Sequence, residues 1–198
     1  MNKKVEEVLK GNCIVYPTST LPALGCTLTS ESLDELYKIK KRPAKMIVSI
    51  GVSNLKQASE LVHLTHDLEN FMSAFPEGSL TIILPAKKTL DSRLGGEKIA
   101  IRVLADPVAK EFIEKTGPLT ATSANISGSE PLRDCEMAAK TAVEKIFSIY
   151  DVDNSGYLDP KELKSLLTKY NDGVAPDDET IIFIIRICDH EDEEKGQE

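Results

Sequence analysis

Residues 151–162 restrict the fold of this chain more than any other segment. Oxygen-bearing groups recur there at the spacing of a metal-binding loop, and Gly156 at the sixth position permits a sharp turn. Ca²⁺ prefers roughly six to eight oxygen ligands, and carboxylates crowded into one short loop repel each other without a cation. The spacing therefore predicts a calcium loop. Its expected ligands are the side chains of Asp151, Asp153, Ser155, Asp159 and Glu162 and the carbonyl of Tyr157.

Amphipathic segments flank this loop on both sides. Residues 144–150 place Ile146, Phe147 and Tyr150 on one helical face, and a second helix is predicted from Asp159-Pro160. This helix–loop–helix resembles an EF-hand of the calmodulin-like proteins. The alternative is a solvated acidic loop, which requires the loop spacing and both helices to coincide by accident.

A second hand begins but is incomplete in this sequence. Residues 177–179 open an apolar helix, and a loop that starts at Asp189 has Glu194 where the glycine is needed and no closing glutamate. We expect no second calcium site and a solvated acidic tail over 191–194. The helix is expected to bury its apolar residues, which are Ile181, Ile182, Ile184, Ile185 and Cys188.

The charge is divided unevenly between two parts of the chain. Residues 1–140 carry 18 basic and 17 acidic side chains, whereas residues 141–198 carry 6 basic and 15 acidic ones. This asymmetry predicts two domains, 1–140 and 141–198. The join falls in a predicted helix near 138–144 without a Gly- or Pro-rich linker, and both a natural fusion and a chimera remain open.

The first part alternates short β-branched runs with helical patterns, which predicts an α/β fold with a mixed sheet, followed by a small all-α segment. Ser32 with Glu35 predicts a capping box for a helix to about Lys40, and Asp106-Pro107 predicts the start of a helix to about Lys115. The expected strands are Cys13–Tyr16, Ile47–Val52, Leu80–Leu84, Ile99–Val103 and Leu119–Thr122.

Polar turns follow the first and last of these strands. Residues 16–20 and 122–128 are rich in hydroxyl groups, and ligands of open α/β sheets bind where strands end. The cations of residues 40–42 end a helix. The simpler interpretations are ordinary turn chemistry for the hydroxyl groups and a favourable helix end for the cations.

Several classes of protein are disfavoured. The GxSxG, GxGxxG and Walker motifs are absent, and His63 and His66, in a predicted helical region, have no partners at metal spacing. No run of 18 apolar residues and no signal peptide is found. The four cysteines are far apart in sequence and form no CxxC pair, so we expect no disulfide framework and a reducing, cytoplasmic location.

Five motifs follow one another along the first part of the chain. They are Tyr16-Pro17-Thr18-x-Thr20 with Leu24-Gly25-Cys26, Lys40-x-Arg42-Pro43, Phe75-Pro76-x-Gly78-x-Leu80-Thr81, Ala100-Ile101-Arg102-Val103, and Thr122-Ser123-Ala124-Asn125-x-Ser127-Gly128. In this order and rough spacing, the first part resembles the YrdC-like family, the threonylcarbamoyl-AMP synthases of tRNA modification, over about residues 5–137. The joint order of the motifs makes the resemblance specific.

The resemblance implies a cavity that takes L-threonine, bicarbonate and Mg-ATP. The threonine amine becomes a carbamate that attacks the α-phosphate of ATP, and the product reaches tRNA through partner proteins. By the same resemblance Lys40 and Arg42 hold the triphosphate, while Thr122, Ser123 and Asn125 bind phosphate or nucleotide. Thr18, Thr20 and Arg102 are implied around the threonine.

The chain departs from the family pattern at several positions. Lys41 replaces a common glycine, Pro22-Ala23 stand where Tyr-Gly is usual, and the loop after Lys45 is shortened. After Met137 the family's further strands are missing. An exposed sheet edge is therefore expected, and binding can survive where turnover does not.

Three functions follow from these observations. The first is an ATP-dependent threonylcarbamoyl-AMP synthase or a degenerate relative that still binds nucleotide. The second is a calcium-binding module with a non-catalytic YrdC-like scaffold. The third is a nucleic-acid binder, which the near-neutral first part and the acidic tail disfavour.

Overall fold

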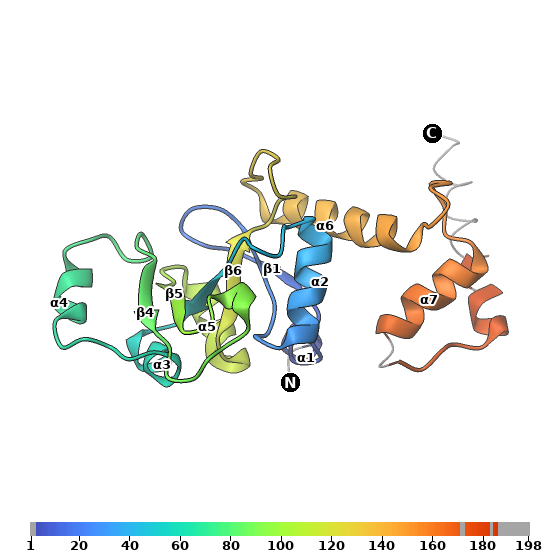
Figure 1. Ribbon diagram of the computed structural model, residues 1–198. Coiled ribbons are helices and arrows are strands. Elements are labelled where there is room, and N and C mark those ends of the chain that lie inside the picture. The colour runs from blue at the N-terminus through green and yellow to red at the C-terminus, as the bar shows by residue number, and fades with distance from the viewer. Residues whose placement is uncertain (1–2, 171–172, 183, 186–198) are drawn as a thin grey trace. The chain divides into compact units, whose positions relative to one another are not determined.

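The computed structural model describes residues 3–170, 173–182 and 184–185, which form two compact units, Met1–Ala142 and Val143–Glu198 (Figure 1). None of the helices in the described ranges combines the length and the apolar character that a membrane crossing requires.

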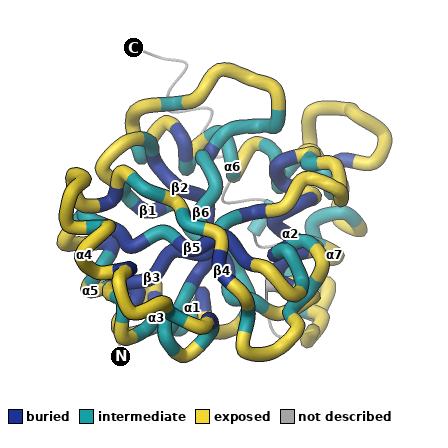
Figure 2. The backbone as a smooth tube through the Cα atoms, turned by 60° about the vertical axis from the view of Figure 1, so that its left-hand side comes forward, coloured by how far each residue is buried: buried dark blue, intermediate teal, exposed yellow. Residues whose placement is uncertain are grey.

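The first unit is built on one six-stranded mixed sheet with the strand order β1-β2-β6-β3-β5-β4. All neighbouring strands are antiparallel except β3 and β5, which run parallel. Figure 2 shows these strands as the buried centre of the unit, with exposed loops around them. The strands are β1 (Ile14–Tyr16), β2 (Ala23–Gly25), β3 (Ser49–Val52), β4 (Ile82–Pro85), β5 (Lys98–Val103) and β6 (Leu119–Ser123).

Seven helices of four residues or more and one 3₁₀ turn have complete bounds within the described residues. The helices are α1 (Lys3–Leu9), α2 (Ser30–Lys40), α3 (Leu55–Leu61), α4 (Leu68–Ser73), α5 (Pro107–Thr116), α6 (Cys135–Tyr150) and α7 (Pro160–Tyr170), and the 3₁₀ turn is η1 (Ser92–Leu94). The predicted α/β class with a mixed sheet and C-terminal helices is confirmed.

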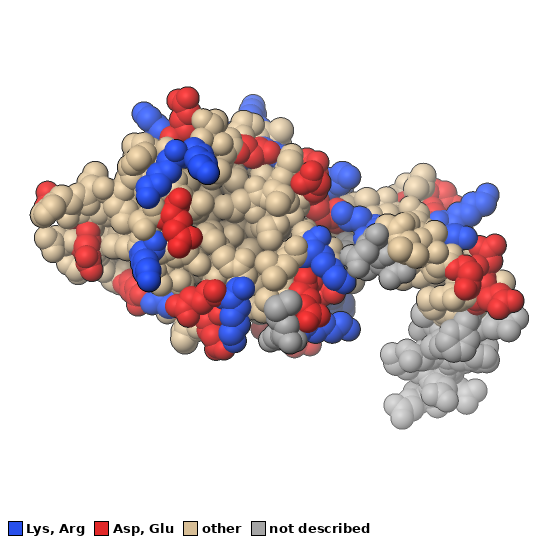
Figure 3. Space-filling view, turned by 90° about the horizontal axis from the view of Figure 1, so that it is seen from below, with Lys and Arg blue, Asp and Glu red and all other residues tan. Residues whose placement is uncertain are grey.

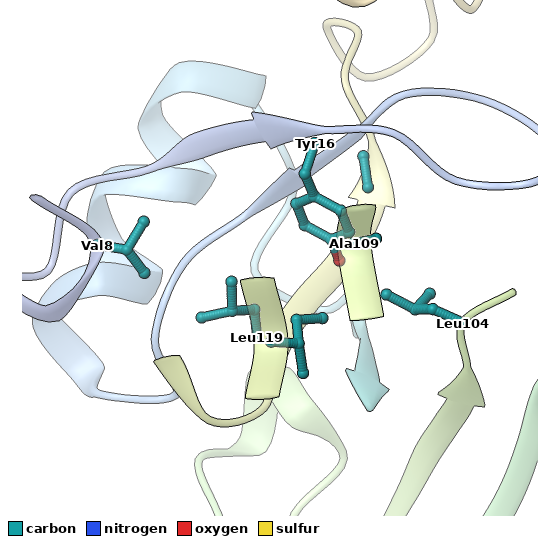
Figure 4. Packing of buried hydrophobic residues seen from close by; sticks show 7 residues of the cluster. Val8, Tyr16, Leu104, Ala109 and Leu119 are labelled. Carbon is teal, nitrogen blue, oxygen red and sulfur yellow. The ribbon is translucent and has the colours of Figure 1, made fainter. Parts of the chain in front are cut away.

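A buried cluster joins α1 and α5 to the sheet. The Tyr16 ring points into this cluster (Figure 4), and its hydroxyl group donates a 2.8 Å hydrogen bond to the carbonyl of Thr120. Burial keeps the pKa of Tyr16 well above its ordinary value, so this hydroxyl stays protonated. Strand β1 is thereby fixed to β6. The cluster consists of Val8, Tyr16, Ala23, Leu104, Ala109, Ile113 and Leu119.

The predicted capping box at Ser32 was wrong. The cap of α2 is Thr29, whose hydroxyl accepts the backbone N–H of Ser32, so the helix begins at Ser30. Ser32 lies in the first turn, where its hydroxyl is 2.9 Å from that of Thr29. The predicted cap at Asp106 is confirmed, because its carboxylate accepts the N–H of Ala109.

The structure differs from the predicted helices and strands in two further places. Strand β2 was not expected, although it pairs with both β1 and β6. His63 and His66 follow α3 in an extended segment and a turn, not in the expected helix. Among the described residues no strand follows β6, and β4 forms a sheet edge on which Ile83 is exposed.

The second unit contains the loop between α6 and α7 and a further helical segment. Asp177 caps that segment by accepting the N–H of Thr180 at 2.7 Å, and residues 178–182 and 184–185 are helical. Ile181 is buried as expected, whereas Ile182 is exposed. The predicted positions Cys188 and Asp189 and the acidic tail lie outside the described residues.

Lys41 ends α2 in the left-handed conformation, with φ 47° and ψ 40°. A side chain makes this conformation costly, which explains why glycine suits the position. We expect Lys41→Gly to raise the free energy of unfolding by about 0.5–1 kcal/mol, measured as a higher urea midpoint at unchanged m-value.

Lys38→Gly is the matched control, because it removes an exposed lysine from the same helix. Inside a helix glycine costs about 1 kcal/mol, so this variant should unfold at lower urea. Equal losses in both variants would show that residue 41 does not hold the left-handed conformation.

Candidate functional site

Lys40 is the buried charge around which the site is built. It lies in the last turn of α2, and the residue is 2% exposed. Its Nζ donates to the carbonyl of Asn125 at 2.6 Å and to that of Ser123. The backbone N–H of Ser127 in turn donates to the carbonyl of Lys40 at 2.8 Å. These hydrogen bonds connect the end of α2 to the turn after β6. Lys40 therefore does more than interact favourably with the dipole of its own helix.

Burial, and then the nearby charge of Arg42, lower the pKa of Lys40 to about 8. Removing an ammonium group from water disfavours its charged form, and a second cation adds to this effect. A bound anion would stabilise the charged form of Lys40 and so counteract both effects on its pKa. The position therefore favours a negatively charged ligand.

The same turn holds two buried polar atoms without hydrogen-bond partners, Oδ1 of Asn125 and Oγ of Ser127. The amide nitrogen of Asn125 is used locally, since it donates to the carbonyls of Ile126 and Ser129. Leaving a buried polar atom unpaired costs about 1–3 kcal/mol, so these atoms point to a ligand or to bound water. Ser127 belongs to the matched motif, but sequence reasoning gave it no binding role.

Arg42 is hydrogen-bonded within its own loop. Its Nε donates to the carbonyl of Met46 at 2.9 Å and its Nη2 to that of Ile47 at 2.8 Å. Both contacts lie within its own loop. In this structure Arg42 shapes the loop after α2, and three of its five N–H donors are not used by these two bonds.

A second group of predicted residues gathers at the loop between β1 and β2. Nη2 of Arg102, from β5, donates to the hydroxyl of Thr20 at 3.1 Å, and its Nε donates to the carbonyl of Gly78 at 2.9 Å. The Thr18 hydroxyl donates to the carbonyl of Leu21 at 2.7 Å. Thr18 therefore stabilises its own turn, while the bond between Thr20 and Arg102 connects the β1–β2 loop to β5.

Gly78 allows this loop to approach closely. A Cβ atom there would lie 2.9 Å from the Oγ of Ser19 and from the Cβ of Ala105, and φ is 76°. Glycine is needed at this position on both counts. The motif at 75–81 is thus placed beside the motif at 16–20.

The two groups are joined through the backbone, because the N–H of Ala124 donates to the carbonyl of Pro22 at 2.8 Å. Thr122 pairs with Leu24 and Ser123 with Ala23. Successive residues of a strand point to opposite faces of the sheet, so the side chains of Thr122 and Ser123 lie on different faces. The structure brings Lys40 together with Ser123 and Asn125.

A cavity of about 350 Å³ lies beside the second group. Gly78 and Val103 contribute to its wall, as do apolar side chains from α3 and α4. Among the described residues that line it, none belongs to the predicted site. The cavity is therefore lined by parts of the 75–81 and 100–103 motifs and by none of the residues of the two polar turns.

The loop between α6 and α7 collects three carboxylates. Oxygen atoms of Asp151, Asp153 and Glu162 all lie within 4.8 Å of one another. Asp151 accepts the N–H groups of Ser155 and Gly156, each at 3.0 Å. These bonds hold the loop closed around a set of oxygens that suits a hard cation.

The remaining predicted oxygens have partners within the loop. The hydroxyl of Ser155 donates to the carbonyl of Tyr157 at 3.0 Å, which places the fifth and seventh positions side by side. Asp159 caps α7 by accepting the N–H groups of Lys161 and Glu162. Glu162 accepts the N–H of Val152 at 2.7 Å and so ties the two ends of the loop together.

Two family models match the chain. The model of the Sua5/YciO/YrdC family, described as telomere recombination, matches residues 6–160. An EF-hand model, described as an EF-hand domain pair, matches residues 140–195. The two matches overlap over residues 140–160, which the structure assigns to α6 and the acidic loop.

Relatives in sequence are named threonylcarbamoyl-AMP synthases. The chain is 30% identical to the one from Actinobacillus pleuropneumoniae serotype 3 over 178 residues, which covers 84% of this chain and 94% of the relative. It is 34% identical to that of Aliivibrio fischeri over 140 residues, with 67% and 76% covered.

Solved structures match the first unit. E. coli YciO superimposes with a TM-score of 0.61 at 29% identity, covering 70% of each chain. P. abyssi Sua5, solved in complex with L-threonine, superimposes with a TM-score of 0.64 at 26% identity. That match covers 69% of this chain, which spans only 42% of the Sua5 chain.

The lowered pKa of Lys40 predicts how stability depends on pH. Between about pH 8 and the ordinary lysine value of 10.5, the unfolded chain keeps a proton that the folded chain has lost. The free energy of unfolding therefore gains a contribution from Lys40 as pH rises through this window. We expect the urea midpoint of the wild type to rise relative to that of Lys40→Met between pH 7 and pH 10.

This difference between the two proteins isolates Lys40, because the other titrating groups are present in both. Lys38→Met, on the exposed side of the same helix, serves as the control and should show a constant difference. A constant difference for Lys40→Met as well would contradict the burial of its ammonium group.

Proposed function

The chain belongs to the Sua5/YciO/YrdC family, and we propose that its first unit binds ATP and forms L-threonylcarbamoyl-AMP from L-threonine, bicarbonate and Mg-ATP. In this reaction the threonine amine and bicarbonate give a carbamate and release water. A carbamate oxygen then attacks the α-phosphate, and pyrophosphate leaves. The names of the relatives support the reaction, and the polar turns support the substrate.

The observation that carries the proposal is the buried set of hydrogen-bonding groups around Lys40. A nucleotide offers phosphate oxygens that accept from an ammonium group and a serine hydroxyl, and ribose or adenine groups that donate to an amide oxygen. Lys40, Ser127 and Oδ1 of Asn125 are such groups. Positioning and charge neutralisation supply most of the catalysis in phosphoryl-type transfer, so no nucleophilic side chain is needed.

We assign Thr20 and Arg102 to the threonine side of the site. Their mutual contact lies at the loop that Pro22 ties to the 123–127 turn, so an amino acid held there would face the nucleotide. Ser123, Thr122 and Thr18 then act through the backbone and the shape of the turns, and Arg42 through its loop. The location proposed for this chemistry is the cytoplasm, and tRNA is reached through partner proteins.

Direct nucleic-acid binding is not favoured. On the face shown in Figure 3, basic and acidic side chains are interspersed over the first unit. Lys110 makes an ion pair with Glu77, and Arg93 makes ion pairs with Asp34 and Asp91. A phosphate backbone needs cations that are free to replace its counterions.

We propose a second activity for the other unit, which we treat as a separate domain. The carboxylates of Asp151, Asp153 and Glu162 would hold Ca²⁺, with further oxygens from Ser155 and Tyr157 and with Asp159 acting through water. The match to the EF-hand model supports this proposal. If the first unit does not turn over ATP, calcium binding is the alternative function of the chain.

The enzyme proposal predicts pyrophosphate release that requires ATP, L-threonine and bicarbonate together. Ser127→Ala removes a buried hydroxyl group without a partner, so stability should not fall. Because that hydroxyl would bind the nucleotide, ATP affinity should fall about 5–30-fold, measured by calorimetry alongside the rate of pyrophosphate release.

Ser129→Ala, two residues further on and exposed, is the matched control and should change neither quantity. If Ser127→Ala binds ATP normally but is less stable than wild type, the hydroxyl has a structural partner. Release of pyrophosphate without threonine would refute the proposed reaction.

The calcium proposal predicts one site by calorimetry on the full chain. Glu162→Gln keeps an oxygen that can accept the N–H of Val152 but removes the charge and weakens bidentate binding. Affinity should fall at least about tenfold, which corresponds to 1.4 kcal/mol. Glu179→Gln removes one exposed charge elsewhere in the unit and should bind normally. Two equal sites, or unchanged binding by Glu162→Gln, would overturn the assignment.

A further inference from the structure

Cys13 and Cys26 are neighbours in the fold, although thirteen positions separate them in sequence. In the antiparallel pair of β1 and β2, Ile14 lies opposite Gly25. One step further along the same register places Cys13 opposite Cys26, and their side chains are hydrogen-bonded to each other. The spacing of the cysteines in sequence does not indicate that this pair is adjacent in the fold, where both are free thiols.

The surroundings of the two thiols differ. Cys26 is fully buried, its N–H donates to the hydroxyl of Thr120 at 3.0 Å, and its Sγ lies 3.6 Å from the same oxygen. Cys13 is partly exposed. The hydrogen bond from Cys13 is the main cause that lowers the pKa of Cys26. A reagent in solution therefore reaches Cys13 first, and the buried Cys26 lies next to it.

The backbone suits a covalent bond between them. Directly opposite residues of an antiparallel pair have Cα atoms about 4.5–5.5 Å apart. A disulfide accepts Cα separations of about 4.4–6.8 Å. A pair that continues this register would therefore fall in the range of Cα separations that a disulfide accepts.

We propose that Cys13 and Cys26 form a dithiol–disulfide site that responds to small-molecule disulfides and closes the open end of the β1–β2 hairpin. The thiolate of Cys13 attacks one sulfur of the reagent and releases one thiol. The thiolate of Cys26 then attacks the Cys13 sulfur and releases the second thiol. The protein loses two thiol hydrogens, and one small disulfide is reduced to two thiols.

This site lies outside the proposed nucleotide chemistry but on the same hairpin. Residues 17–22, which carry Thr20 and contact the 123–127 turn through Pro22, connect the two strands. The bond would fix the hairpin at the end opposite this loop. The proposal stands on its own, because it concerns the thiols and not the reaction of ATP.

Glutathione disulfide is the probe, applied to the full chain, with alkylation and mass spectrometry as the readout. Trypsin should release residues 11–38 as one peptide, because no Lys or Arg lies between Gly11 and Lys38, and this peptide holds both cysteines. We expect it unalkylated and about 2 Da lighter than its reduced form. Cys135 should remain alkylated under the same conditions.

Variants separate the two steps. Cys26→Ser should keep a glutathione adduct on Cys13, because the resolving thiol is gone, and Cys13→Ser should leave Cys26 reduced. Because the second step is intramolecular, the wild-type pair should oxidise at about tenfold lower glutathione disulfide than is needed to modify Cys13 in Cys26→Ser. Cys135→Ser should behave as wild type.

Two results would overturn the proposal. One is a stable glutathione adduct on Cys13 in the wild type, which would show that Cys26 cannot reach it. The other is a wild-type pair that stays reduced when Cys135 is already modified. The unmodified mass of Cys13→Ser keeps the test decisive even if Cys26→Ser folds poorly.

Discussion

A buried ammonium group connects the parts of the first unit that carry its chemistry. Lys40 ends α2, yet its hydrogen bonds reach the carbonyls of the turn that follows β6. A charge in this position is costly unless its donors are satisfied, so the turn and the helix must keep their relative placement. That placement also leaves two buried side-chain oxygens, Oγ of Ser127 and Oδ1 of Asn125, without hydrogen-bond partners. These unpaired atoms lower the stability of the fold, and a ligand could supply their missing hydrogen bonds.

The second unit applies the same principle with the opposite charge. Its carboxylates are held close together by backbone N–H donors of their own loop, and the remaining repulsion is what a cation relieves. The sites proposed for the two units are therefore complementary, one for an anion and one for a cation. Within the first unit, the contact of Arg102 with Thr20 and the backbone bond from Ala124 to Pro22 bring the loop of the β1–β2 hairpin to the anion site.

Features that are local in sequence could be predicted, and features that depend on distant contacts could not. All oxygens of the acidic loop lie within twelve residues, and the cap at Asp106 acts on Ala109. Thr29 and Ser32 are both good caps, so the choice between them required the structure. Strand β2 has only three residues and follows Pro22, which gives too short a pattern to detect. The partners of Lys40 are 83 and 85 positions away, and no spacing rule reports such contacts.

A crystal structure of the full chain with a non-hydrolysable ATP analogue and L-threonine tests the central claim most directly. We predict a phosphate oxygen within hydrogen-bond distance of Lys40 Nζ and Ser127 Oγ, with threonine beside Thr20 and Arg102. Nucleotide bound instead in the 350 Å³ cavity beside α3 and α4, with the Lys40 cluster unchanged, would contradict it.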